Sequence, residues 1–161
     1  MDANVFKGFY ESEMGNAHTL SGCPIKLMSK CTPDTPIYHD VGRIIENEWQ
    51  QVVDYDWFTT WLSVQLLAGK ISYVEPKHDN ELEKKMANVG FPKGRDIVYA
   101  RVCLSVVDLK GQPCTLYTED LDFYDPKQKK CTAKTRAKLL LAATGPICKI
   151  LKKKKIHVSS V

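Results

Sequence analysis

The clearest apolar pattern in the chain lies between residues 96 and 126, and it constrains the fold more than any other stretch. In "DIVYARVCLSVVDLKGQPCTLYTEDLDFYDP", apolar residues alternate with other residues at the start, and the turn-forming stretch "DLKGQP" follows. A period of two places every second side chain on one face, which is typical of a strand. The run "CTLYTEDLDFY" then returns as its partner. The pattern therefore predicts an antiparallel β-hairpin with this core face: Val98, Ala100, Val102, Leu104 and Val106.

Helical spacing occurs before the predicted hairpin. Apolar residues three and four positions apart predict an amphipathic helix over 40–53 and a second helix over 57–69, with Gly69 as its C-terminal stop. The charged stretch 77–90 fits a short helix or a surface loop equally well. The apolar spacing within the two helices predicts that their aromatic residues pack in the core.

A further helix is predicted after the hairpin, over 133–144, with Thr132 as its cap and Leu139 to Leu141 as its apolar centre. Gly145 and Pro146 end it. Short strands are predicted over 25–28, 70–76 and 147–158.

This order of elements favours an α+β fold: a single domain in which an antiparallel β-sheet packs against a few α-helices. Residues 1–22 show only weak periodicity and are predicted to form a flexible N-terminal arm. The domain would then cover residues 23–161, with a basic C-terminal end.

The net charge of +4 conceals a strong asymmetry along the chain. Residues 1–125 hold 12 basic and 19 acidic residues, whereas residues 126–161 hold 11 basic residues and no acid. Such a segment is typical of proteins that bind a polyanion, although it also fits a solvated tail.

The apolar content of 43% is ordinary for a globular protein. Scattered cysteines and the lack of a signal or spanning segment favour a reduced, cytosolic protein.

Sequence motifs for catalysis are not found. The chain has no glycine-rich phosphate loop and no zinc-binding spacing of histidine and cysteine. His39 beside Asp40 fits a helix entry better than a proton relay. The stretch "TEDLDFYD" carries four acids and suits a hard cation, but carboxylates on the face of a strand explain it more simply. We therefore predict no catalytic residue, no metal, no cofactor and no enzymatic activity.

The basic end has two plausible polyanionic ligands. Each lysine near an anionic membrane contributes about 1 kcal/mol to the free energy of membrane binding. With single-stranded RNA, about five phosphate contacts give a plot of log binding constant against log salt concentration with a slope on the order of −3.5. The predicted membrane- or ribonucleoprotein-binding residues are Lys134, Arg136, Lys138, Lys149, Lys152, Lys153, Lys154 and Lys155.

The order of four segments resembles the matrix proteins of rhabdoviruses, over roughly residues 24–157. These segments are "TPIYHDVGRIIENEW", "WFTTWLSVQLLAGKISYVEP", the predicted hairpin, and "KTRAKLLLAATGPICKILKKKKIHV". The basic N-terminal arm and the late-domain motifs of the animal viruses are absent, so the chain is more similar to short, plant-infecting members. This departure leaves budding through host sorting machinery without support.

The resemblance implies a non-enzymatic structural protein that self-associates, condenses the viral nucleocapsid and its RNA, and contacts anionic membrane lipids. The viral glycoprotein is a further implied partner. The implied location is the virion beneath the envelope, with host cytoplasm, membranes and the nucleus as sites during infection. A small arm or loop would dock on a neighbouring subunit. The candidate self-association residues are Phe6, Phe9, Tyr10 and Trp57.

A small viral RNA-binding protein, similar to a silencing suppressor, is the alternative, and a cytosolic enzyme with an unrecognised site is the third reading. The RNA-binding protein would use the same lysines but prefer duplex RNA and form a discrete dimer.

Overall fold

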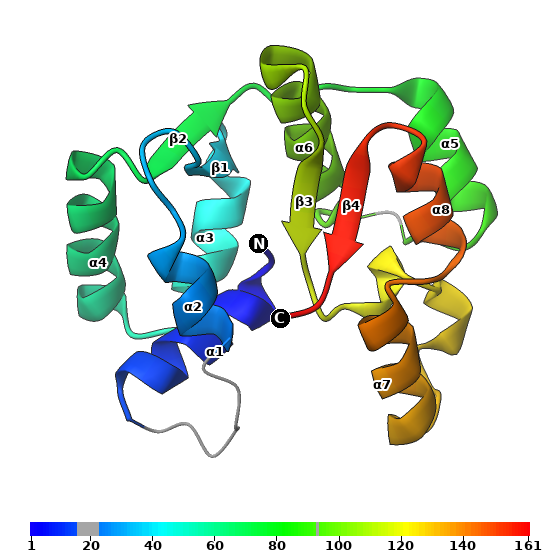
Figure 1. Ribbon diagram of the computed structural model, residues 1–161, viewed down its shortest axis with the longest axis horizontal. Helices are drawn as coiled ribbons and strands as arrows, with labels where there is room; N and C mark the ends of the chain where they lie inside the picture. The colour runs from blue at the N-terminus through cyan, green and yellow to red at the C-terminus, as the bar shows by residue number, and fades with distance from the viewer. Residues whose placement is uncertain (16–22, 93) are drawn as a thin grey trace.

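The computed structural model describes residues 1–15, 23–92 and 94–161 (Figure 1). Within them the chain alternates pairs of helices with short strands. The elements, in chain order, are α1 (Ala3–Glu13), α2 (Cys23–Ser29), β1 (Ile37–Asp40), α3 (Ile44–Gln50), α4 (Tyr55–Leu67), β2 (Ile71–Val74), α5 (Asn80–Asn88), α6 (Ile97–Lys110), β3 (Cys114–Tyr117), the 3-10 turns η1 (Leu121–Phe123) and η2 (Pro126–Gln128), α7 (Ala133–Ala142), α8 (Pro146–Lys152) and β4 (Ile156–Ser159).

The strands form two separate parallel pairs, so the predicted antiparallel sheet is wrong, although the α+β class is right. β1 pairs with β2 in the register Ile37 to Ile71, and β3 pairs with β4 in the register Cys114 to Ile156. Each pair is joined by a crossover that contains two α-helices, as parallel strands require. Figure 1 shows one pair in each half of the molecule, with the amino terminus between them.

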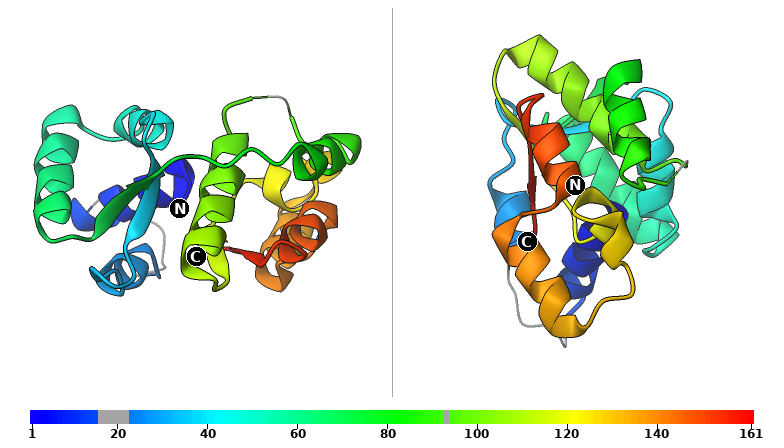
Figure 2. Two further views of the ribbon diagram at one scale, coloured as in Figure 1. Left: turned by 90° about the horizontal axis from the view of Figure 1, so that it is seen from above. Right: turned by 90° about the vertical axis from the view of Figure 1, so that its right-hand side faces the viewer.

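Helix α6 replaces the first strand of the predicted hairpin, and it has more buried residues than any other described helix. The buried residues, among them Val98 and Cys103, lie around most of the helix, and a polar strip of Arg101, Ser105 and Asp108 runs along the remaining side. The helix packs against all four strands, and Figure 2 (left) shows it between the two halves. Gly111, with φ at 68°, ends this helix instead of forming a hairpin turn.

The N-terminal segment folds back into the core instead of forming an arm. Val5, Phe6 and Phe9 are buried on one side of α1, and the ring of Phe6 stacks on Trp49 with a centroid distance of 4.1 Å. The remainder of the predicted arm, residues 16–22, lies outside the described residues. The strand predicted over 25–28 is also wrong, because α2 covers these residues.

The C-terminal segment contains α7, α8 and β4 in place of the predicted helix and single long strand. Thr132 caps α7 by accepting a hydrogen bond from the Thr135 amide, as predicted. However, no residue of α7 is buried, and Leu141 is 88% exposed, so its leucines are not the centre of a core. The buried apolar residues of this segment are Ile147, Cys148 and Leu151 of α8 and Ile156 and Val158 of β4.

Several local predictions are confirmed. α4 ends before Gly69, which has φ at 67°, and β2 follows it. For the charged stretch 77–90, where the sequence left a helix and a surface loop equally open, the structure has helix α5, whose buried residues are Leu82 and Met86. The Asp40 carboxylate accepts hydrogen bonds from the Ile44 and Ile45 amides at the start of α3, 2.8 and 2.9 Å away.

His39 is fully buried beside this cap. Its ring lies edge-on to Trp49, and within the described residues neither ring nitrogen has a hydrogen-bond partner. Burial, with a smaller contribution from the positive chain terminus, lowers the pKa of His39 from 6.5 to about 3. The side chain is therefore a neutral member of the core at physiological pH.

We expect His39 to make the protein sensitive to mild acid. Below pH 6.5 His39 becomes protonated in the unfolded chain, but in the folded protein it stays neutral down to about pH 3. The free energy of unfolding therefore falls as the pH falls. The loss should reach about 2 kcal/mol at pH 5. Urea unfolding at pH 7 and pH 5 should show this loss in the native protein and a smaller one in His39→Leu. Equal pH dependence in both proteins would contradict the assignment.

Candidate metal centre

Three aspartates from two separate parts of the chain come together beside the start of helix α6. Carboxylate oxygens of Asp96, Asp120 and Asp122 all lie within 4.8 Å of one another. Asp122 is buried, and Asp96 and Asp120 are half-buried. Within the described residues this is the group whose spacing suits a metal ion.

Two helix starts place these carboxylates. Asp96 directly precedes α6, but its side chain makes no capping hydrogen bond, so it remains available to a ligand. Asp120 begins η1 and accepts a hydrogen bond from the Asp122 amide at 2.9 Å. This tight turn holds Asp120 and Asp122 together beside the first turn of α6.

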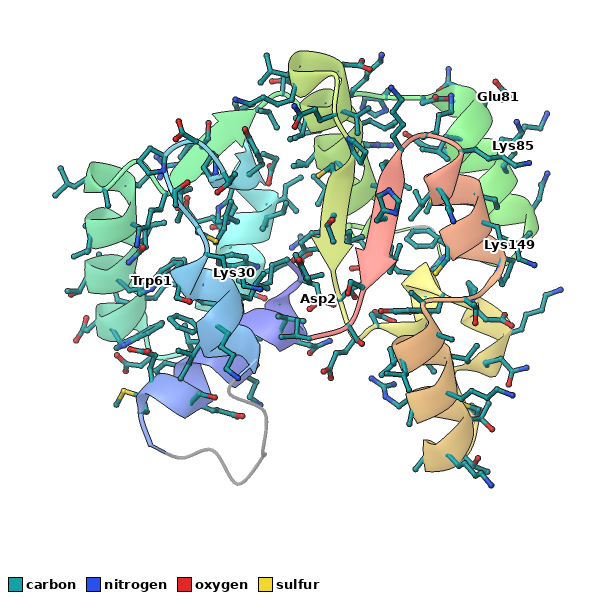
Figure 3. The ribbon with its side chains drawn as sticks, viewed as in Figure 1. Asp2, Lys30, Trp61, Glu81, Lys85 and Lys149 are labelled. Atoms are coloured by element: carbon teal, nitrogen blue, oxygen red, sulfur yellow. The ribbon has the colours of Figure 1, made fainter. Side chains whose placement is uncertain are left out.

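Asp2 forms a supporting network next to the three aspartates. Its carboxylate accepts hydrogen bonds from the Val5 amide at the start of α1 and from the Thr118 hydroxyl. The Thr118 hydroxyl oxygen in turn accepts a hydrogen bond from the Asp120 amide at 3.0 Å. Figure 3 shows Asp2 in the middle of the molecule, beside the end of β3. Asp2 therefore ties the N-terminus to the segment that carries Asp120.

Glu48 adds a fifth carboxylate from α3. Its Oε2 accepts a hydrogen bond from the Tyr99 hydroxyl of α6 at 2.7 Å. Its charge is close enough to Asp96 and Asp2 to be repelled by both. Five acidic side chains from four separate parts of the chain thus converge on one region.

The electrostatics of this region favour a bound cation. Burial raises the pKa of Asp96, and repulsion by Asp120 and Asp122 raises it further. Burial also raises the pKa of Asp122 and of Glu48, against the opposing hydrogen bonds from Lys129 and Tyr99. Asp96, Asp122 and Glu48 are therefore harder to ionise than in water, first because they are buried and then because neighbouring acids repel them.

Lys129 supplies part of the missing charge. Its Nζ lies 2.5 Å from Asp122 Oδ2, and this contact raises the pKa of the lysine. Asp122 Oδ1, in contrast, is buried without a hydrogen-bond partner among the described residues. A buried charged oxygen without a partner is costly, and a metal ion would satisfy it.

The donor set suits a hard divalent cation. Carboxylate oxygens are the ligands that Mg²⁺, Mn²⁺ and Ca²⁺ prefer, whereas zinc sites use histidine and cysteine. Asp96, Asp120 and Asp122 would hold the ion, with Asp2 and Glu48 as the surrounding negative charge. The sequence expectation of no metal site is untested, and this geometry supplies a reason to test it.

The predicted polyanion-binding residues lie on neighbouring parts of the C-terminal half. Lys134, Arg136 and Lys138 are exposed on α7, Lys149 and Lys152 are exposed on α8, and Lys153 to Lys155 form the turn before β4. Figure 3 shows Lys149 at the outer edge of α8. Lys154 differs from the others because its Nζ pairs with Asp79 Oδ2 at 2.7 Å.

Arg136 connects this basic region to the carboxylates. Its Nη2 donates a hydrogen bond to the Glu119 main-chain oxygen at 2.6 Å, directly before Asp120. Gly145 allows the start of α8 to approach the same segment, because a Cβ at this position would lie 2.1 Å from the Tyr124 main-chain oxygen and clash with it. Arg136 therefore links the first turn of α7 to the segment that carries Asp120 and Asp122.

The residues predicted for self-association are not all on the surface. Phe6 and Phe9 are buried within this chain, whereas Tyr10 and Trp57 are half-buried and contact each other edge-on, with a centroid distance of 4.7 Å. Self-association itself remains a prediction, but Phe6 and Phe9 are unsuited to it without unfolding of α1.

Comparison of the chain with protein-family models, curated proteins and solved structures finds no match. The resemblance to rhabdovirus matrix proteins therefore remains a prediction. No helix among the described residues combines the length and apolar character needed to cross a bilayer.

We expect Asp96→Asn to separate charge repulsion from metal binding. Without metal at pH 7, the variant should be more stable than the native protein, because the ionised Asp96 is repelled in the folded state. The difference should shrink towards pH 4, since a carboxylate with a raised folded-state pKa costs stability only when it is ionised. Thermal unfolding in chelator, across pH, measures both effects.

Added Mn²⁺ or Mg²⁺ should reverse this order. At a free metal concentration 100 times the dissociation constant, binding adds about 2.7 kcal/mol to the free energy of unfolding. For a chain of this size, this corresponds to a rise of about 5–10 °C in the unfolding midpoint. The native protein and the control Asp56→Asn, an exposed position on α4, should show the full rise. An equal rise in Asp96→Asn would exclude a role for this carboxylate in metal binding.

Proposed function

We propose that this protein is a divalent-metal-dependent phosphodiesterase that cleaves nucleic acid. The observation that carries the proposal is the cluster of Asp96, Asp120 and Asp122, in which the buried Asp122 Oδ1 lacks a partner. A carboxylate cluster of this kind is how proteins hold the ions that assist phosphoryl transfer.

The metal, when bound, would polarise a phosphoryl oxygen and lower the pKa of a coordinated water. Asp96, Asp120 and Asp122 would hold and orient the ion. Lys129, already paired with Asp122, would fix that carboxylate and add positive charge close to a phosphate. Arg95 lies near Glu48 and is exposed, so it is a second cation at the edge of the centre.

The basic residues of α7 and α8 support nucleic acid as the substrate class. A phosphodiester backbone needs positive charge along its length, and that charge begins at Arg136, which contacts the segment of the acidic centre. Small phosphorylated metabolites would need no extended basic region. The acidic centre and the basic helices together therefore favour a polymer.

The matrix function predicted from the sequence remains the second candidate. The same exposed lysines of α8 suit an anionic membrane or a nucleocapsid. That function has no use for a converging group of buried carboxylates, which is why we place it second. Binding to anionic vesicles without any cleavage of nucleic acid would reverse this order.

We expect purified protein to cleave single-stranded RNA or DNA in Mn²⁺ or Mg²⁺ and to be inactive in chelator. Asp122→Asn and Asp96→Asn should each lower kcat/KM on the order of 10²–10³-fold, because each removes a ligand of the ion. Asp56→Asn should retain native activity. Circular dichroism would establish that the variants fold. Folded, metal-saturated native protein that cleaves neither polymer would contradict the proposal.

The basic residues should govern substrate affinity but not the chemical step. The variant Lys152→Glu, Lys153→Glu, Lys155→Glu leaves the Lys154–Asp79 pair intact. It should raise KM and leave kcat unchanged. The slope of log binding constant against log salt concentration for single strands should become shallower by about 2, because each lost phosphate contact removes about 0.7.

A control with the same charge change on exposed lysines elsewhere, at Lys7, Lys26 and Lys84, should have a smaller effect. Equal effects of the two triple variants would mean that net charge, and not this surface, determines affinity.

A further inference from the structure

Two cysteines line one cavity beside helix α6 and strand β3. The cavity has a volume of about 450 Å³, and both Cys103 and Cys114 contribute to its wall. Cys103 lies in the middle of α6, and Cys114 is the first residue of β3. Both are free thiols, but Cys103 is buried and Cys114 is half-buried. Cys114 is thus the more accessible residue of the two.

The connection between α6 and β3 brings these cysteines within reach of each other. Helix α6 ends at Lys110, and three residues separate its end from Cys114. A connection of this length spans at most about 14 Å. Cys103 lies seven residues before the end of the helix, which is a distance of about 10 Å along its axis. The strand can therefore start beside Cys103.

Both cysteines lie on the sides of their elements that face each other. On β3, Cys114 shares a face with Leu116, which is buried in the same core as the residues of α6. Helix α6 and strand β3 pack directly against each other. The cavity-lining residues of α6 have the spacing of one helix face: Tyr99, Val102, Cys103, Val106 and Lys110.

The two thiols interact directly. The Cys103 thiol donates a hydrogen bond to the Cys114 sulfur, which lowers the pKa of Cys114 and raises the pKa of Cys103. Burial opposes the change at Cys114 and adds to the change at Cys103. The thiolate is the nucleophilic form of cysteine. Cys114 is therefore the sulfur that reacts first, and Cys103 is placed to react second.

A third thiol in the same cavity differs from this pair. Cys31 is also half-buried, but its Sγ donates a hydrogen bond to the Leu27 main-chain oxygen at 3.5 Å. Burial raises the pKa of Cys31. Cys31 therefore holds its proton more firmly than Cys114, although both line the cavity.

Metal binding does not account for these three sulfurs. Among the residues that the structure describes, the spacing that suits a metal ion occurs at the aspartates, and the cysteines of this cavity are not part of such a group. Two adjacent thiols of unequal acidity, in contrast, are suited to oxidation in two steps.

We propose that Cys114 and Cys103 form a site that hydrogen peroxide oxidises to a disulfide. The Cys114 thiolate attacks one peroxide oxygen, so that a sulfur–oxygen bond forms and the oxygen–oxygen bond breaks. The leaving hydroxide takes up the proton that the Cys114 thiol lost, which gives the first water. This inference does not rest on the proposed function.

The second step closes the disulfide. Cys103 gives up its proton and attacks the Cys114 sulfur, the sulfur–oxygen bond breaks, and the leaving hydroxide takes that proton to form a second water. Two thiols are oxidised, and one peroxide is reduced to two waters. The new bond joins the helix that begins after Asp96 to the strand that precedes Asp120.

The test treats the full, reduced chain with an equimolar amount of hydrogen peroxide. Chelator is present throughout, because free metal ions oxidise thiols without selectivity. Peptide mapping by mass spectrometry identifies the oxidised cysteines, and a reagent that traps sulfenic acid captures the intermediate. The variants are Cys114→Ser, Cys103→Ser and, as a matched control from the same cavity, Cys31→Ser. Circular dichroism would establish that they fold.

The native protein and Cys31→Ser should form the disulfide between Cys103 and Cys114. Oxidation of Cys114 should be on the order of 10-fold faster than oxidation of Cys31, because more of it is thiolate. Cys103→Ser should accumulate the sulfenic acid of Cys114, and Cys114→Ser should leave Cys103 reduced.

Three results would overturn the proposal. They are native protein that forms no disulfide between these residues, equal rates of oxidation at Cys31 and Cys114, and a disulfide that pairs Cys114 with Cys31 instead. All three are measured in the native protein, so they do not require any variant to fold. None of them depends on cleavage of nucleic acid.

Discussion

Burial of helix α6 is the interaction on which the rest of the structure depends. The helix packs against β1 and β2 in one half and against β3 and β4 in the other. Its seven buried residues supply much of the shared core, and burial of one aliphatic side chain stabilises the fold by about 1.5–3 kcal/mol. The same helix begins directly after Asp96, so the packing that joins the two halves also fixes one carboxylate of the acidic centre. Core and site cannot be separated here.

The acidic centre costs stability, and the fold tolerates that cost. Burial and repulsion by neighbouring acids raise the pKa of Asp96 and Asp122. When these two side chains are ionised, they therefore lower the free energy of unfolding. Asp122 pairs with Lys129, but no lysine or arginine among the described residues pairs with Asp96 or Asp120, where an amide of similar shape would avoid the repulsion. Local departures from the most stable choice are expected where a protein binds or reacts. This unfavourable arrangement is therefore stronger evidence for a cation site than the number of acids alone.

Local signals in the sequence predict several elements, but the pairing and direction of the strands are not accessible from it. The Thr132 cap, the Gly69 stop and strand β2 follow from residues close to each other in the chain. Helix α6 is buried around most of its circumference and has only a narrow polar strip at Arg101, Ser105 and Asp108, so its helical period is weak. Its apolar residues also fall at every second position, as in a strand. The stretch "TEDLDFYD" suggests a cation, yet its partner Asp96 lies 24 positions before Asp120 and joins it only through the fold.

The topology explains why the acidic centre lies where it does. All strands of a parallel sheet end at one edge, and ligands of open α/β sheets bind beyond that edge, where the strand order changes direction. Asp2 bonds to Tyr117 at the carboxyl end of β3, and Thr118 and Asp120 follow that same end. The carboxylates of Asp2, Asp120 and Asp122 therefore gather beyond the end of β3, where the start of α6 adds Asp96.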